Sequence, residues 1–245
     1  MRSILTFFCL LTFASVACAA GSSVTYSVNG QEYEGYYVSP GADAPLVLLI
    51  HDWDGLTDYE VKRAEMLAAM GYAVFAADLF GKGVRPTEVQ DKRQHTGELY
   101  KDRAKMRALL NGALATAKTQ GGNIANAVTM GYCFGGAAVL EFARSGVEMK
   151  GFATFHGGLQ TPEGQNYSQT KGPLLIMHGS ADSAIPMEQF AALAVELETQ
   201  GVSHEMITYS GAPHAFTVYG GTNYRKDADE KSWQRFSDYL NQTLR

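Results

Sequence analysis

The stretch AVTMGYCFGGAAVLEFAR, residues 127–144, indicates the fold more strongly than any other part of this 245-residue chain. Its first five residues predict a short buried strand, and its last ten predict a helix. Between them, Gly131 and Gly135 each stand two residues from Cys133. A sharp strand-to-helix turn has no room for larger side chains at these two positions. The pattern therefore predicts that Cys133 is a nucleophile presented on such a turn.

The rest of the chain alternates strands and helices. Residues 24–37 alternate around Asn29-Gly30, which favours a tight turn and predicts an antiparallel hairpin at the N-terminal edge. Further strands are expected at residues 45–50, 72–79, 127–131, 152–155, 174–177 and 204–209, and helices at residues 58–70, 98–118, 135–144, 187–200 and 226–240, with a loop and a short helix over residues 81–95. This alternation predicts an α/β fold with a mostly parallel central sheet and helices on both faces.

The composition sets limits on size and partners. Hydrophobic residues make up 46% of the chain and charged residues 18%, which suits one compact domain over residues 21–245. The net charge of −5 gives no indication of the clustered basic face that a nucleic acid partner needs. We therefore expect a small-molecule substrate and no nucleic acid.

Residues 1–20 have the layout of a secretory signal peptide. Arg2 precedes the apolar run Ile4–Phe13, and Ala17-Cys18-Ala19 fits a small-residue cleavage site. The apolar run is too short to span a bilayer, so we expect an exported protein, periplasmic or secreted, without stable membrane insertion. The alternative is a lipoprotein acylated at Cys18, although Ser15 stands where such proteins usually have Leu.

Removal of this segment would leave one cysteine. Cys9 and Cys18 lie within it, so mature protein would keep only Cys133, which cannot form an intramolecular disulfide. A lone cysteine is either an inert buried thiol or a reactive one, and the glycine-flanked turn favours the second reading.

A thiol nucleophile needs a histidine base. His51, His156, His178 and His214 all follow predicted strands, and in this type of fold the chain order is nucleophile, acid, base. Only His204 and His214 lie late enough, and His204 begins a strand rather than lying in a loop. We therefore predict His214 as the base, with His51 and His178 as structural residues that bond backbone groups at strand ends.

The acid that orients the base should lie between nucleophile and histidine in the chain. Asp182 meets this condition, because it follows the strand at residues 174–177 and precedes His214. A simple loop or helix-capping role is its alternative. Asp78 also lies at a strand end, but it precedes Cys133 and is expected to cap or shape the pocket.

Two backbone amides are candidates for stabilising the negatively charged oxygen of a tetrahedral intermediate. The amide of Phe134 follows the nucleophile at the start of a helix, where the helix dipole favours negative charge. The second donor should come from the loop His51–Gly55, where Trp53 is our candidate and Gly55 would let the turn close.

The motifs Gly131-Tyr132-Cys133-Phe134-Gly135-Gly136, His178-Gly179 followed by Asp182, and Pro213-His214-Ala215-Phe216 resemble those of the dienelactone hydrolase family. The resemblance covers roughly residues 25–243. It implies a single-domain α/β-hydrolase with a Cys-His-Asp triad that needs no metal or organic cofactor. The best-known members hydrolyse cyclic enol lactones, so the resemblance implies cleavage of a carboxylic ester or lactone through an acyl-enzyme intermediate.

Two positions depart from the family pattern. Asp52 stands where members carry a Glu that helps to deprotonate the resting thiol, and Val218 stands where they carry an Arg for the lactone carboxylate. Arg103 could supply that cation from elsewhere or be a solvated surface residue. The departures leave an alternative function open: a non-catalytic module on the same fold that binds a small molecule or a protein.

Overall fold

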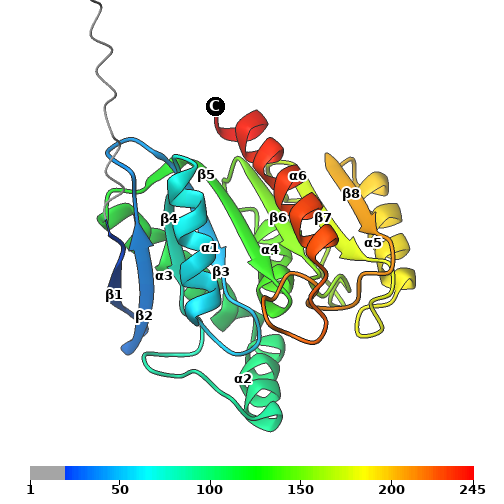
Figure 1. Ribbon diagram of the computed structural model, residues 1–245, viewed down its shortest axis with the longest axis horizontal. Helices are drawn as coiled ribbons and strands as arrows, with labels where there is room; N and C mark the ends of the chain where they lie inside the picture. Colours follow the sequence, from blue (N-terminus) through cyan, green and yellow to red (C-terminus); the bar gives the residue numbers. More distant parts are fainter. Residues whose placement is uncertain (1–19) are drawn as a thin grey trace, which may run out of the picture.

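The computed structural model describes residues 20–245, which form one eight-stranded sheet in the order β1-β2-β4-β3-β5-β6-β7-β8 (Figure 1). Strands β3 to β8 run parallel, and β2 pairs antiparallel with both β1 and β4. The strands are β1 Ser22–Val28, β2 Gln31–Val38, β3 Pro45–Ile50, β4 Ala73–Ala77, β5 Asn123–Tyr132, β6 Gly151–Phe155, β7 Leu174–Gly179 and β8 His204–Tyr209. The helices are α1 Asp58–Ala69, α2 Val89–Lys101, α3 Arg103–Thr119, α4 Phe134–Arg144, α5 Met187–Thr199 and α6 Lys226–Leu244.

Helices cover both faces of the sheet, as predicted. Helices α1 and α6 pack on one face, in front of the sheet in Figure 1, and α3, α4 and α5 pack on the other. Strand β3 shows why its sequence is apolar throughout: Leu46, Leu48 and Ile50 enter one core, and Val47 and Leu49 enter the opposite one. A strand buried on both faces has no polar side, so it reads as a continuous apolar run.

The N-terminal hairpin is confirmed. Strands β1 and β2 pair antiparallel around Asn29 and Gly30, whose φ angles of 51° and 82° are the positive values that a two-residue hairpin turn requires. The hairpin joins the sheet through β4, so that β1 forms one edge of the sheet and β8 the other.

One element differs from the prediction. A short helix within residues 81–95 and a longer helix over residues 98–118 were expected, but α2 ends at Lys101 and α3 begins at Arg103, so the boundary between the two helices lies at Asp102. Asp102 leaves the helical conformation, with φ −112° and ψ 80°, and its side chain accepts a hydrogen bond from the amide of Lys105 at 2.8 Å. A side chain that caps α3 in this way ends α2.

The proposed signal peptide, its lipoprotein alternative, Cys9 and Cys18 lie outside the described residues, apart from Ala20. Within residues 20–245, none of the helices is both long and apolar enough to cross a membrane. Cys133 is the free cysteine of the same part of the chain.

Candidate active site

Cys133 lies on the turn between β5 and α4, with φ 50° and ψ −113°, a backbone conformation that side chains rarely adopt. Glycines make this turn possible. A Cβ on Gly131 would lie 2.4 Å from the carbonyl oxygen of Gly135, and a Cβ on Gly135 would lie 2.4 Å from the carbonyl oxygen of His51. The glycine spacing thus has the steric cause expected for a sharp strand-to-helix turn.

Two hydrogen bonds join the three side chains predicted to form a triad. The Sγ of Cys133 lies 3.1 Å from Nε2 of His214, and Nδ1 of His214 lies 2.8 Å from Oδ2 of Asp182. The three residues follow β5, β8 and β7, so they meet at the carboxyl edge of the parallel sheet. The other carboxylate oxygen of Asp182 accepts from the amides of Ala184 and Ile185, which turns Oδ2 toward the imidazole.

The electrostatics of these side chains favour a charged imidazole. Burial alone would lower the pKa of His214, but its hydrogen bonds with Asp182 and Cys133 outweigh burial and raise that pKa to about 10. Burial likewise opposes ionisation of Asp182, yet the hydrogen bond and charge of His214 lower the pKa of that carboxyl. An imidazolium held between a carboxylate and a sulfur is the environment that stabilises a thiolate.

The other strand-end histidines bond elsewhere. His51 contacts backbone groups through both ring nitrogens, and His178 contacts the carbonyl of Ile185 at 2.9 Å. His204 lies 2.7 Å from the carbonyl of Val202. His156 is fully buried and contacts the hydroxyl of Thr217 at 2.8 Å. Among residues 20–245, His214 is the histidine hydrogen-bonded to Cys133.

Asp78 has a local structural role. Its carboxylate accepts hydrogen bonds from the amides of Glu34, Phe80 and Gly81, at 3.0, 3.0 and 3.1 Å. These bonds tie the end of β4 to β2, which agrees with the expected capping role.

The loop after β3 lies directly against the cysteine turn. The carbonyl of His51 in this loop is the group that a Cβ on Gly135 would strike. Gly55 closes the loop with φ 88°, and Nζ of Lys92 in α2 lies 5.2 Å from the ring centroid of Trp53. Phe134 opens α4, so its amide is among those at a helix start that have no acceptor within the helix.

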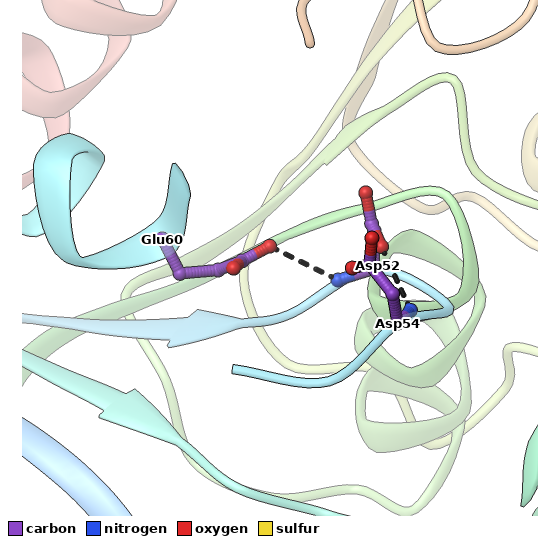
Figure 2. A group of neighbouring side chains, drawn as sticks. All are labelled: Asp52, Asp54 and Glu60. Atoms are coloured by element: carbon purple, nitrogen blue, oxygen red, sulfur yellow. Dashed lines mark hydrogen bonds between the residues drawn. The ribbon is translucent and has the colours of Figure 1, made fainter. Parts of the chain in front are cut away.

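Asp52 lies near Cys133 within a group of carboxyls. Figure 2 shows it with Asp54 and Glu60, and Asp52 Oδ1 accepts the amide of Asp54 at 3.0 Å. Burial raises the pKa of Asp52 well above its usual range, and Asp54, Glu60 and Cys133 raise it further. Within the described residues, Asp52 makes no hydrogen bond to Cys133. Its side chain, one methylene shorter than that of Glu, therefore lies close to the thiol without bonding to it.

The same three carboxyls are the described residues that could hold a metal ion. Their ligand oxygens lie within 4.8 Å of one another. However, both oxygens of Glu60 already accept hydrogen bonds, and Asp54 lies 3.5 Å from the ammonium of Lys92. Both oxygens of Glu60, Oδ1 of Asp52 and Oδ2 of Asp54 thus each have a partner within the chain.

A cavity of about 410 Å³ lies near the loops of the site, although Cys133, Asp182 and His214 are not among its lining residues. Its lining includes Ala137, whose amide donates to the carbonyl of Cys133, and Ile185, whose amide donates to Asp182. It also includes Tyr100, where burial and the nearby charge of Cys133 both raise the pKa. Tyr100 thus brings the cavity within electrostatic range of the thiol.

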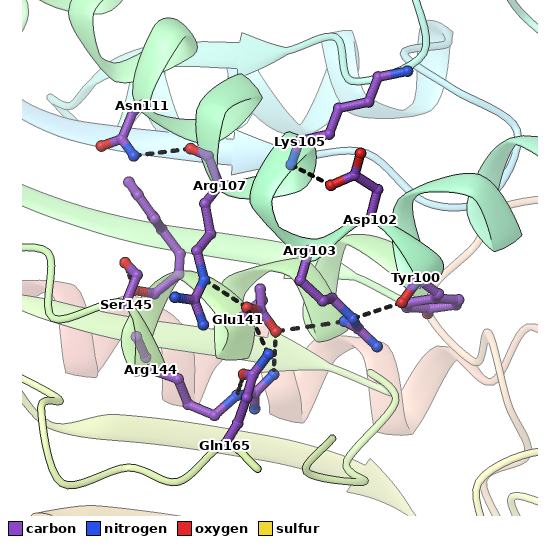
Figure 3. A network of polar contacts seen from close by, with 12 residues as sticks. Tyr100, Asp102, Arg103, Lys105, Arg107, Asn111, Glu141, Arg144, Ser145 and Gln165 are labelled. Atoms are coloured by element: carbon purple, nitrogen blue, oxygen red, sulfur yellow. Dashed lines mark hydrogen bonds and ion pairs between the residues drawn. The ribbon is translucent and has the colours of Figure 1, made fainter. Parts of the chain in front are cut away.

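The wall of this cavity is positively charged. Figure 3 shows Glu141, which is fully buried, in ion pairs with Arg103, Arg107 and Arg144 at 3.6, 2.6 and 2.9 Å. Arg103 and Arg144 line the cavity. Nε of Arg103 donates to the carbonyl of Tyr100, while in the described part of the chain no hydrogen bond engages Nη1 or Nη2. Arg103 is thus a partly buried residue of the cavity wall, with N–H groups that make no hydrogen bond within the described residues, rather than a solvated surface residue.

Sequence reasoning missed several residues that surround the site. Glu60 and Thr217 were not singled out, although each is fully buried. Glu60 accepts the amide of Asp52 in the loop after β3, and Thr217, in the loop that carries His214, accepts a hydrogen bond from Arg63 of α1. The pattern Thr57-x-x-Glu60 was a visible signal, since it is a capping box. Thr217 had no comparable signal beyond its place three residues after His214.

Comparisons with known proteins agree with the fold. A model described as the dienelactone hydrolase family matches residues 33–244. Two relatives named "Putative carboxymethylenebutenolidase" come from Escherichia coli strain K12 and Aquifex aeolicus. The first is 23% identical over 227 residues, covering 87% of this chain and 84% of the relative. The second is 25% identical over 201 residues, covering 80% and 87%.

Solved structures also resemble this one. A dienelactone hydrolase-like promiscuous phosphotriesterase from metagenomic libraries superposes with a TM-score of 0.87. It is 25% identical in sequence, and the match covers 94% of this chain and all of the other.

Proposed function

The chain belongs to the dienelactone hydrolase family, and on this premise we propose that it hydrolyses a carboxylic ester or lactone with Cys133 as the nucleophile. His214 is the general base and acid, and Asp182 orients it. The observation that carries the proposal is the pair of hydrogen bonds at 3.1 and 2.8 Å that links these side chains in the order thiol, imidazole, carboxylate. A non-catalytic module would have no use for this chain of contacts, so the enzyme is favoured over the binding alternative.

The reaction proceeds in two halves. The thiolate of Cys133 attacks the carbonyl carbon, and the amides of Trp53 and Phe134 hold the resulting oxyanion. When the intermediate collapses, the C–O bond breaks and His214 donates a proton to the leaving alkoxide, which leaves a thioester on Cys133. His214 then takes a proton from water, the hydroxide attacks the thioester, and the carboxylic acid departs as the thiolate is restored.

Activation of the thiol falls to His214 in this proposal. Within residues 20–245 the carboxyl of Asp52 makes no hydrogen bond to the thiol, and its Oδ1 instead accepts the amide of Asp54, whereas His214 contacts the sulfur directly. Asp52 therefore has a different role from the Glu that the family carries at this position: it shapes the loop that carries Trp53.

The cavity near Cys133 is the proposed substrate pocket. Tyr100, Ala137 and Ile185 supply apolar surface, and the guanidinium of Arg103, although ion-paired with Glu141, keeps Nη1 and Nη2 without a hydrogen bond among the described residues. Two arginines, Arg103 and Arg144, give this wall its positive charge. We expect esters with a carboxylate on the substituent that enters this cavity to bind better than neutral ones of the same size. The E. coli and Aquifex relatives are named for a butenolide that bears a carboxymethylene group.

Export is a separate part of the proposal. The layout of residues 1–20 favours a signal peptide, with acylation at Cys18 as the alternative. Expression of the full chain in a bacterial host, followed by N-terminal sequencing of the periplasmic fraction, should give a start at residue 20 or 21. A start at Met1 would remove the signal peptide, and a lipid-modified Cys18 would select the alternative.

Covalent capture tests the chemistry. Purified protein is mixed with an aryl ester, quenched in acid after milliseconds and analysed by mass spectrometry of its peptides. We expect the acyl group on the peptide that contains Cys133, and none after iodoacetamide treatment. Full activity of the alkylated enzyme, or an acyl group on another residue, would reject Cys133 as the nucleophile.

A further inference from the structure

Glu60 of helix α1 joins the two ends of the loop that carries Trp53. Its Oε1 accepts the amide of Asp52 at 3.3 Å, near the start of the loop (Figure 2). Its Oε2 accepts the amide and the hydroxyl of Thr57 at 2.8 and 2.9 Å, where the loop ends and the helix begins. A capping box needs only the second of these contacts. The first extends the same carboxylate to the backbone beside Trp53.

The same helix also holds the loop that carries His214. The hydroxyl of Tyr59 lies 2.8 Å from the hydroxyl of Thr217, and Nη2 of Arg63 donates to the carbonyl of Thr217 at 3.0 Å. Nε of Arg63 donates to the oxygen of Tyr59, which leaves the Tyr59 proton free for Thr217. Thr217 lies three residues after His214, so these bonds fix the backbone that presents the imidazole.

Arg63 is itself fixed from the far side. It forms an ion pair with Asp229 of α6, and both side chains are almost fully buried. The hydroxyl of Thr217 meanwhile lies 2.8 Å from Nε2 of His156, whose ring packs edge-on to that of His214 with centroids 5.3 Å apart. The hydroxyl of Thr217 is therefore held between Tyr59 and His156, and its carbonyl by Arg63.

We propose that the N-terminal half of α1 is the positioning element of this active site, in which Glu60 fixes the oxyanion loop and Tyr59 fixes the histidine loop. The inference rests on the proposed function. Neither residue touches the reacting atoms, so both act through the groups that they hold. A helix packed on the sheet moves less than the two loops do. Because both loops are attached to the same helix, the oxyanion donor and the base keep a fixed position relative to each other.

The two arms of the proposal predict different kinetic effects. The oxyanion loop acts on the transition state, so its displacement lowers kcat and leaves both KM and the reactivity of the resting thiol unchanged. The histidine loop sets the contact between His214 and Cys133, so its displacement slows alkylation of the thiol even without substrate.

Glu60→Gln tests the first arm. The variant is nearly isosteric, but its amide nitrogen cannot accept a hydrogen bond, so one end of the loop is released whichever way the side chain faces. We expect kcat for an aryl ester to fall about tenfold or more, with KM and the iodoacetamide rate each within about twofold of wild type. Glu65→Gln, the same change on the outer face of α1, is the matched control and should keep wild-type kcat.

Tyr59→Phe tests the second arm by removing a single hydroxyl. We expect the rate of Cys133 alkylation at neutral pH to fall at least about threefold, together with kcat, because the imidazolium is held less well against the sulfur. Tyr72→Phe is the control, since its hydroxyl bonds Asn241, remote from both loops. Circular dichroism and melting temperature establish that each variant is folded. If Glu60→Gln does not fold, Glu60→Asp, which is too short to span both loop ends, replaces it with the same expected result.

Three results would overturn the proposal: wild-type kcat in Glu60→Gln, wild-type alkylation in Tyr59→Phe, or an equal loss of kcat and alkylation in both variants. The last result would mean a general distortion of the site by α1. Failure of the proposed function itself is distinguishable, because it would appear as activity in wild-type enzyme whose Cys133 is already alkylated.

Discussion

The sulfur of Cys133 lies 3.1 Å from Nε2 of His214 in the resting protein, with the thiol pointing at the imidazole rather than at the carboxyl of Asp52. This contact means that the resting cysteine is already paired with a base. It also places the titratable imidazole of His214 directly against the sulfur.

Alkylation of Cys133 should therefore depend on the protonation of His214. The raised pKa of His214, about 10, means that the imidazole keeps its proton beside the sulfur through the neutral range and loses it only as the pH rises through 10. We expect the wild-type iodoacetamide rate to be already substantial at pH 6. In His214→Gln, which lacks the positive charge beside the sulfur, we expect the rate at pH 6 to be at least about tenfold lower. Superimposable profiles for the two proteins would contradict the ion pair.

Removal of the carboxylate behind the histidine should cost most of the activity. Asp182→Asn keeps the shape of the side chain but removes the negative charge that, with the sulfur, holds His214 protonated. We expect kcat/KM to fall by about 100-fold or more, since the corresponding change in serine triads costs still more. His178 lies 4.0 Å from the same carboxylate, so His178→Gln serves as a control that should lose far less.

The sequence allowed much of this site to be predicted because its chemistry is local. The turn around Cys133 depends on glycines within two residues of it, and the buried strands are uniformly apolar, so both can be recognised in short segments. The place of Asp182 and His214 followed from chain order along a parallel sheet. The break at Asp102 was missed because a capping aspartate in the middle of a polar helical segment resembles an ordinary surface residue.

The attachments of α1 could not be predicted for a different reason. Tyr59 and Thr217 are 158 residues apart, and Glu60 and Asp52 make a contact that depends on how the loop folds back on the helix. Arg103 was equally ambiguous, because its exposure depends on α2, α4 and the buried Glu141. Such contacts arise from the tertiary packing, which periodicity within one segment does not encode.

A methyl group at the cysteine turn should be far more harmful than one in a surface helix. In Gly135→Ala the new Cβ would lie 2.4 Å from two backbone carbonyls, which cannot move without shifting β3. We expect a loss of stability of about 2 kcal/mol or more, in the range for overpacked sites, and loss of activity. In Gly97→Ala of α2 the Cβ meets nothing within 4 Å, and stability should rise by about 0.5–1 kcal/mol. Urea denaturation of both variants checks the contrast, which equal effects would refute.

Arg103 should decide how well the enzyme binds anionic esters. Arg103 lines the cavity, and within residues 20–245 its Nη1 and Nη2 make no hydrogen bond. In Arg103→Gln we therefore expect KM for an aryl ester with a terminal carboxylate to rise about tenfold or more, since a charge-assisted hydrogen bond contributes about 1.5–3 kcal/mol. KM for the neutral ester of the same length should not change. Arg107 forms the shorter ion pair with the same Glu141 but is not among the residues that line the cavity. Arg107→Gln is therefore the control, because it removes an ion pair of Glu141 without removing a contact to the substrate. An equal rise of KM in both variants would show that the cluster serves the packing of α3 on α4 and not the substrate.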